Sequence, residues 1–307
     1  MKLYKKAAAC LLTAAMARSM LTACGGGGGT PNKPGGNTPS TLPTNPDEIV
    51  LPDIGEGEGG GEGTETKPTK TPIIDVNSSK LAQFNKRYAG ATEFCVEVQQ
   101  VGYDEDGSVA ESMDGSVARK GEDYYVRMTG LDEDQKQQLI EILMRKNNKS
   151  TWDQYLLLRS SKVAVNTGST DEVDMSLSTL IADKLPDQMW STKVKVGPTE
   201  YYAEVYNAYS SEYTICYTPD GKPVYEFVRD LKETQLERAT LYKTIQAGSG
   251  SSKGLCELPR GFKIYSKGEK NGQLIDANGK VFTVEPQDNG AFKVFDQTGK
   301  DVTADFK

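Results

Sequence analysis

The sequence predicts a mainly β fold of the α+β class, in which a large curved antiparallel sheet carries about three short helices. Tyr accounts for 15 of the aromatic residues, against 8 Phe and 2 Trp, and aromatic and β-branched residues favour strands. Apolar and polar residues alternate with a period of two over many short stretches. These stretches are joined by short connections, and strands joined in this way pair antiparallel because parallel pairing needs long crossovers.

The folded part opens with a short helix, expected between a cap at Ser78 or Ser79 and a stop at Gly90. Leu81 and Phe84 lie on one face of this helix. Alternation then predicts strands at 93–99, 108–119 and 124–128.

Two further helices are expected, at 132–145 and 171–185. The first has an acidic beginning, a basic end and an apolar stripe of Leu139, Ile142 and Leu143. The second ends at Pro186, which cannot continue a helix. Strands at 152–159 and 162–166 are expected between them.

The remainder of the chain reads as almost purely β. Strands are expected at 191–196, 199–207, 211–217, 223–229, 236–245 and 255–265. In the last forty residues the segment 274–280 recurs loosely as 294–300, which predicts two β-hairpins in a small C-terminal extension. The Asp276-Ala277-Asn278-Gly279 element hints at calcium, but the rest of a calcium-binding loop is missing.

The amino-terminal residues read as an export signal. Lys2, Lys5 and Lys6 precede an apolar stretch at 7–17 that is too short to span a bilayer. The sequence Leu21-Thr22-Ala23-Cys24 resembles the lipobox of bacterial lipoproteins. This resemblance implies a diacylglyceryl group in thioether linkage to the Cys24 sulfur and cleavage just before Cys24. Arg18 departs from the pattern, and the alternative is an ordinary secretory signal or an uncleaved anchor.

Four regions follow from these patterns: a signal peptide at 1–23, a lipidated Cys24 with a tether at 24–76, a folded domain at 77–266 and the hairpin extension at 267–307. The tether is rich in Gly, Pro, Thr, Asn and Glu, so little apolar burial offsets the entropy of ordering it. We therefore expect a disordered coil with a mean length of roughly 40 Å.

The charge and composition exclude several functions. Removing residues 1–23 changes the net charge from −7 to −11, because they hold four basic residues and no acid. This charge disfavours nucleic acid as a partner. The chain has no His, hence no ordinary triad base or common zinc ligand. No carboxylate pair stands out for glycosidase chemistry. We expect no enzyme activity, no cofactor and no metal.

Three cysteines remain besides the signal residues and Cys24. Cys95, Cys216 and Cys256 all fall on expected strands, and their spacing matches no metal motif. An odd number permits at most one internal disulfide. Either all three are buried thiols, or two of them are paired; the sequence does not say which two.

One resemblance concerns the folded domain. The stretches TICYTPDGKPVYEFVRD, LERATLYKTI and CELPRGFKIY, between Gly197 and Tyr265, resemble the final strands of the Lol-type lipoprotein carriers and of half-barrel lipid-binding lipoproteins. The order of elements over 78–265 is similar too. The C-terminal hairpins and the tether depart from that family. The resemblance implies a half-barrel with a concave apolar face that acyl chains could fill.

The sequence thus favours a membrane-tethered, extracytoplasmic lipoprotein, at the cell surface or in the periplasm, that binds a lipid or other amphiphile. The alternative is an envelope scaffolding protein with a fully packed sheet and a protein partner. Candidate ligand-lining residues are Phe94, Val96, Val98, Tyr124, Val126, Trp152, Tyr155, Leu157, Tyr201, Val205, Tyr213 and Ile215. The ligand, the partner and the oligomeric state are not encoded in any recognisable motif.

Overall fold

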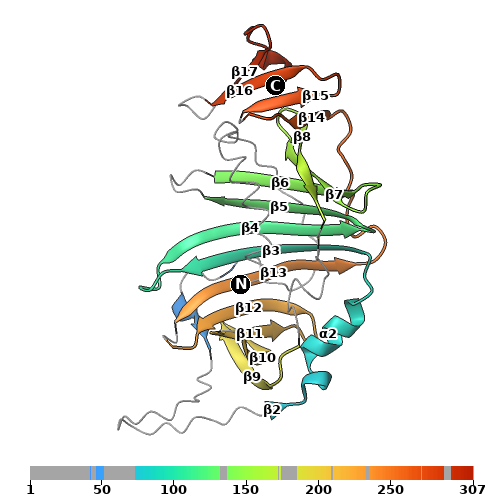
Figure 1. Cartoon of the computed structure of the whole chain (residues 1–307). Coiled ribbons are helices and arrows are strands. Elements are labelled where there is room, and N and C mark those ends of the chain that lie inside the picture. The colour runs from blue at the N-terminus through green and yellow to red at the C-terminus, as the bar shows by residue number, and fades with distance from the viewer. Residues whose placement is uncertain are drawn as a thin grey trace.

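The computed structural model describes residues 42, 46–51, 73–131, 137–171, 173, 185–208, 210–232, 235–270, 272–286 and 292–306. Most of them belong to one large, curved and open antiparallel sheet (Figure 1). The predicted mainly β fold is confirmed. Residues 1–24, with the expected signal and the lipidation site, lie outside the described residues. Within the described part, no helix has the length and apolar character needed to cross a membrane.

The strands are, in chain order, β1 Ile49–Val50, β2 Ile73–Ile74, β3 Glu93–Tyr103, β4 Val109–Lys120, β5 Asp123–Leu131, β6 Gln137–Lys146, β7 Trp152–Leu158, β8 Val163–Thr170, β9 Met189–Val196, β10 Thr199–Ala208, β11 Ser211–Tyr217, β12 Pro223–Asp230, β13 Leu236–Ala247, β14 Lys263–Lys267, β15 Gln273–Asp276, β16 Val281–Pro286 and β17 Phe292–Asp296. The helical elements are η1 Pro46–Glu48, η2 Val76–Ser78, α2 Lys80–Tyr88 and η3 Thr303–Phe306.

Hydrogen-bonded neighbours run through the sheet in the order β9, β10, β11, β12, β13, β3, β4, β5, β6, β7, β8, β14, β15, β16, β17. The short strands β1 and β2 both pair with the outer edge of β9. Every described pair is antiparallel except β8 with β14, which is parallel. Figure 1 shows these strands as one twisted stack, with β17 at one end and β9 at the other.

The opening helix forms where the sequence predicts it. In α2 the hydroxyl of Ser79 accepts a hydrogen bond from the Ala82 N–H at 3.0 Å, so Ser79 is the N-cap. Leu81 and Phe84 are buried against the sheet. The helix ends at Tyr88, two residues before the expected stop.

The helix expected at 132–145 is wrong, because β6 occupies Gln137–Lys146. Leu139, Ile142 and Leu143 have helical spacing, but residues 139–144 are also all apolar except Glu141, which is compatible with a buried strand. Ile142 and Leu143 point to opposite faces of the sheet, and both are buried. A strand that is covered on both faces loses its alternation, so its period does not distinguish it from a helix.

A second expected helix stays a prediction, and one expected strand is wrong in part. The helix expected at 171–185 lies outside the described residues except for 171, 173 and 185. The strand expected at 255–265 is wrong over its first part, because residues 248–262 form turns and β14 begins only at Lys263. The backbone is left-handed at Lys253 (φ 53°) and Gly254 (φ 73°), which bends the chain away from an extended path.

The C-terminal repeat forms two equivalent turns. The Asp276 Oδ1 accepts hydrogen bonds from the N–H groups of residues 278 and 280, and the Asp296 Oδ1 accepts from those of 298 and 300. Gly279 and Gly299 have φ of 80° and 78°, a conformation that favours glycine. The first turn joins β15 to β16, whereas the second leads only to a single bridge between Phe295 and Asp301.

The expectation of a structureless tether at 24–76 needs correction at its described positions. Leu42 and Ile49 are only 4% and 8% exposed, and η1, β1 and β2 are ordered elements within the range. Leu42 and Ile49 are therefore anchoring points on the sheet. We call residues 42 and 46–51 the strap.

Candidate functional site

The sheet has two faces that carry different covers. Side chains alternate along each strand, so residues paired across strands share a face. We call the face against which α2 packs the helix face, and the face against which the strap packs the strap face. On β3, Phe94 and Val96 point to the helix face, whereas Cys95 and Glu97 point to the strap face.

An apolar row crosses seven strands on the helix face. Successive cross-strand partners in this row, from β3 to β14, are Val96, Val117, Val126, Ile142, Leu156, Val165 and Tyr265. We call these seven residues the apolar row. The helix α2 packs through Leu81 and Phe84 on the cluster that contains Val96, at one end of the row. At the other end, Phe306 packs on the cluster that contains Tyr265.

The middle of the row lies over β5 and β6. The cluster here consists of buried Tyr124, Val126, Ile142 and Met144. Met128 and Ile140 are opposite each other on the same face and are only half-buried. Among the described residues outside the sheet, Val173 packs on this cluster. The middle is thus an apolar surface with half-buried side chains at its margin.

The helix α2 is fastened by a buried carboxylate from the sheet. Glu204 of β10 is fully buried, and its carboxylate accepts hydrogen bonds from the N–H groups of Lys80 at 2.5 Å and Leu81 at 2.9 Å. These N–H groups belong to the first turn of the helix, which has no intrahelical partners for them and carries partial positive charge. The Tyr202 hydroxyl donates to the same carboxylate at 3.2 Å.

A second buried acid lies on the helix face beside this point. Glu226 of β12 accepts a hydrogen bond from the Tyr242 hydroxyl at 3.0 Å, and the Arg238 guanidinium lies 3.2 Å from it. Burial raises the pKa of Tyr242 well above its ordinary range, so this phenol stays a neutral donor. The rings of Tyr206 and Tyr213 stack nearby with centroids 5.2 Å apart. The Glu226 carboxylate and the Arg238 guanidinium are thus paired with each other within the β10–β13 region.

The predicted lining residues divide between the two faces. Eight of the twelve share the helix face, namely Phe94, Val96, Val98, Tyr124, Val126, Trp152, Tyr213 and Ile215. The other four, Tyr155, Leu157, Tyr201 and Val205, lie on the strap face. Sequence reasoning missed Val117, Ile142, Leu156, Val165 and Tyr265, which complete the apolar row. Only strand register could have found them, because register decides which residues are neighbours.

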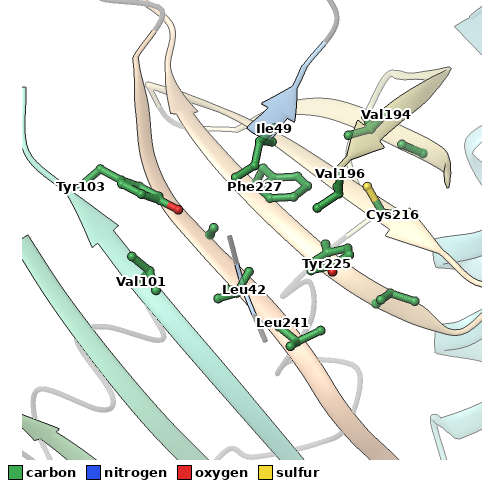
Figure 2. Packing of buried hydrophobic residues seen from close by; sticks show 13 residues of the cluster. Leu42, Ile49, Val101, Tyr103, Val194, Val196, Cys216, Tyr225, Phe227 and Leu241 are labelled. Carbon is green, nitrogen blue, oxygen red and sulfur yellow. The ribbon is translucent and has the colours of Figure 1, made fainter. Parts of the chain in front are cut away.

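The strap covers the second apolar surface, on the other side of the sheet. Leu42 and Ile49 pack among Val101, Tyr225, Phe227 and Leu241, as Figure 2 shows. The Leu42 N–H donates to the Gln99 Oε1 at 3.1 Å. The Gly197 N–H donates to the Glu48 carbonyl at 3.0 Å, which aligns β1 on β9.

A further segment, residues 248–262, covers the other part of the strap face. We call it the cover segment. Its Leu255, Cys256 and Leu258 pack on a cluster that includes Cys95 and Tyr125. Near this cluster, buried Glu141 accepts hydrogen bonds from the Tyr125 hydroxyl and from the Arg159 Nε, the latter at 2.6 Å. Glu141 of β6 therefore has its partners on the strap face.

The three described cysteines are free and buried. Cys95 and Cys216 lie on strands as predicted, whereas Cys256 lies in the cover segment. Burial raises the pKa of Cys95 to about 11 and that of Cys256 to about 12, so both are poor nucleophiles at neutral pH. In the described part of the chain, no three His, Cys, Asp or Glu side chains come together as a metal site.

Comparison with family models gives no match, and neither does comparison with curated proteins. Among solved structures, the chain is similar to an uncharacterized conserved protein from Thermus thermophilus, with 12% identity, a TM-score of 0.34 and coverage of 61% of this chain and 97% of that one. The chain is also similar to a crystal structure of MucB, with 11% identity, a TM-score of 0.31 and coverage of 67% of this chain and 78% of that one. For the Pseudomonas aeruginosa MucA/MucB complex the identity is 10%, the TM-score is 0.31, and the match covers 72% of this chain and 77% of that one. Similarity at this level identifies neither a family nor a function.

Proposed function

We propose that this chain is an extracytoplasmic protein, held on a membrane by lipid on Cys24, that binds a lipid or another amphiphile on its helix face without covalent chemistry. The observation that carries the proposal is the apolar row, which crosses seven strands while α2 packs only at its β3 end. An acyl chain that lies against the half-buried Val117, Met128 and Ile140 would bury their remaining apolar surface at about 25 cal/mol per Å².

The strap determines how the domain would be held by its anchor. With Leu42 on the sheet, only 17 residues separate it from Cys24, whereas 48 residues separate Cys24 from Ile73. For the coil that the composition predicts, the mean reach falls from about 38 Å to about 23 Å. The strap would thus keep the domain close to the membrane from which an amphiphile could enter.

Membrane attachment is tested with a Cys24→Ser variant. The wild-type protein is expected to incorporate a labelled fatty acid and to partition into detergent, whereas C24S is expected to do neither. Equal behaviour of the two proteins would overturn the lipid anchor and leave the binding proposal untouched.

Ligand binding is tested on protein purified without detergent, by lipid extraction and by titration with a fluorescent fatty-acyl probe. Neighbouring residues of β6 supply a matched pair of variants. Ile140 is half-buried on the helix face, whereas Leu139 is 44% exposed and points to the strap face. Ile140→Glu is expected to weaken probe binding at least about 10-fold, because a charge would meet the acyl chain. Leu139→Glu is expected to leave binding unchanged.

An empty protein with no affinity for the probe would exclude amphiphile binding. A scaffolding function would then be favoured by the outer edge of β9, where β1 pairs with Lys195 and Val196 and β2 with Met189 and Trp190. Between them, residues 191–194 have no strand partner on this edge among the described residues. A free strand edge can pair with an extended peptide. Crosslinking from Lys193 in intact envelopes should then recover one partner consistently.

A further inference from the structure

We propose that Cys95 and Cys256 form a disulfide in the exported protein, and that this bond fastens the cover segment to β3. The proposal selects one pair among the three described cysteines. It is independent of amphiphile binding, because both thiols lie on the strap face, opposite the apolar row.

Cys95 and Cys256 belong to one buried cluster. Cys95 is fully buried on β3, and Cys256 is 1% exposed in the cover segment. The residue opposite Cys95 on β4 is Ala118, which is fully buried in the same cluster. Cys216 belongs to a different cluster, beneath the strap. Cys216 is therefore the cysteine that stays a free thiol under this proposal.

Three contacts hold the cover segment at the place where Cys95 lies. Before Cys95, the Glu93 carboxylate accepts from the Ser252 hydroxyl at 2.7 Å and from two backbone N–H groups, those of residues 250 and 252. After Cys95, Glu97 pairs with Lys253 at 3.2 Å. Cys95 thus lies between two strand residues that both bind the cover segment.

The third contact comes from the neighbouring strand. Glu257, next to Cys256 in the chain, pairs with Lys120 of β4 at 2.6 Å. Lys120 is the cross-strand partner of Glu93, two residues before Cys95. These contacts place Cys256 beside the β3–β4 pair at the level of Cys95. Both thiols are free in the structure, so the proposal concerns the protein after it has met an oxidising compartment.

The reaction removes one proton and one electron from each thiol and forms one S–S bond. A small-molecule disulfide such as oxidised glutathione accepts the two electrons and leaves as two thiols. Burial raises the pKa of both thiols, to about 11 and about 12, so attack by a thiolate is slow in the folded protein. We therefore expect the bond to form during folding, before the cover segment closes.

The test is peptide mapping of protein purified from envelopes and of protein refolded with oxidised and reduced glutathione. Trypsin releases Cys95 in peptide 88–119, Cys256 in peptide 254–260 and Cys216 in peptide 196–229. We expect the first two peptides to be linked and the third to be free. The linked species should be lighter by two hydrogen atoms than the sum of its parts.

The stability of the protein gives a second readout. The bond encloses 160 intervening residues, so its reduction is expected to lower Tm by about 5–10 °C. Cys216→Ser should keep both the linked peptides and the shift, whereas Cys256→Ser should lose both. Free thiols at 95 and 256 after oxidative refolding, or a bond that includes Cys216, would overturn the proposal. Because mapping uses the wild-type chain, a variant that fails to fold does not affect this outcome.

Discussion

The attachment of α2 to the sheet through Glu204 gives a prediction that can be worked out quantitatively. Glu204→Ala removes the acceptor for the N–H groups of Lys80 and Leu81, which lie 2.5 and 2.9 Å from the carboxylate. A buried N–H without a partner costs about 1–3 kcal/mol. The loss of a carboxylate at a helix N-terminus adds about 0.5–1 kcal/mol. Only the Leu81 N–H is in a fully buried hydrogen bond, so one such cost and the helix contribution together lower the free energy of unfolding by about 1.5–4 kcal/mol.

The assay is urea unfolding combined with amide hydrogen exchange over residues 80–88. Because Ser79 still caps the Ala82 N–H, we expect α2 to open locally more often without loss of the whole fold. Exchange in 80–88 should therefore accelerate more than exchange in β3. Faster opening of this helix should also accelerate the entry of an acyl probe to the β3 end of the apolar row.

A matched control lies on the same strand. Glu200 of β10 pairs with Lys193 at 2.7 Å, and both side chains are more than half exposed. Exposed pairs contribute about 0–1 kcal/mol, so Glu200→Ala should change stability by less than about 1 kcal/mol. The reasoning fails if Glu204→Ala behaves like this control, with unchanged exchange over 80–88.

Two further predictions concern the strap face. The double variant Leu42→Ser, Ile49→Ser should lower the free energy of unfolding by about 2–4 kcal/mol and expose the strap to proteolysis, because both side chains are buried. The control Val50→Ser should do neither, because the Val50 side chain is already 59% exposed. Acidification should loosen residues 248–257 locally, because the hydrogen bond from Ser252 lowers the pKa of Glu93 from its ordinary value near 4.5. The stabilisation is complete above that value and is lost as the pH falls through the lower folded-state pKa. Exchange over 248–257 should therefore rise below about pH 4 in the wild type, and Glu93→Gln should show the fast exchange already at about pH 7.

Much of the local structure could be predicted from the sequence, because it depends on neighbours in the chain. Ser79 caps α2 through the N–H of a residue three positions later. Asp276 and Asp296 form their turns with residues two and four positions later. The alternation of Phe94 and Val96 with polar neighbours identifies β3 because a period of two is visible there.

The sequence predicts the wrong structure where contacts between residues far apart in the chain determine the conformation. The strand β6 was mistaken for a helix because both of its faces are buried, and the partner of Glu141 that makes this possible is Arg159, directly after the end of β7. The strap was mistaken for tether because Leu42 and Ile49 are isolated apolar residues in a polar stretch, and their burial depends on strands that come much later in the chain. The lining residues were divided over two faces because register was unknown.

The sequence by itself determined most of the strands, the opening helix and the turns. These depend on hydrogen bonds between near neighbours and on the alternation of apolar and polar residues, and both can be recognised within short stretches of the chain. Only the tertiary structure decided which residues form the apolar row, which face the strap covers and which two thiols lie together. Those three features follow from the order and register of strands, and a shift of one residue would move every side chain to the opposite face.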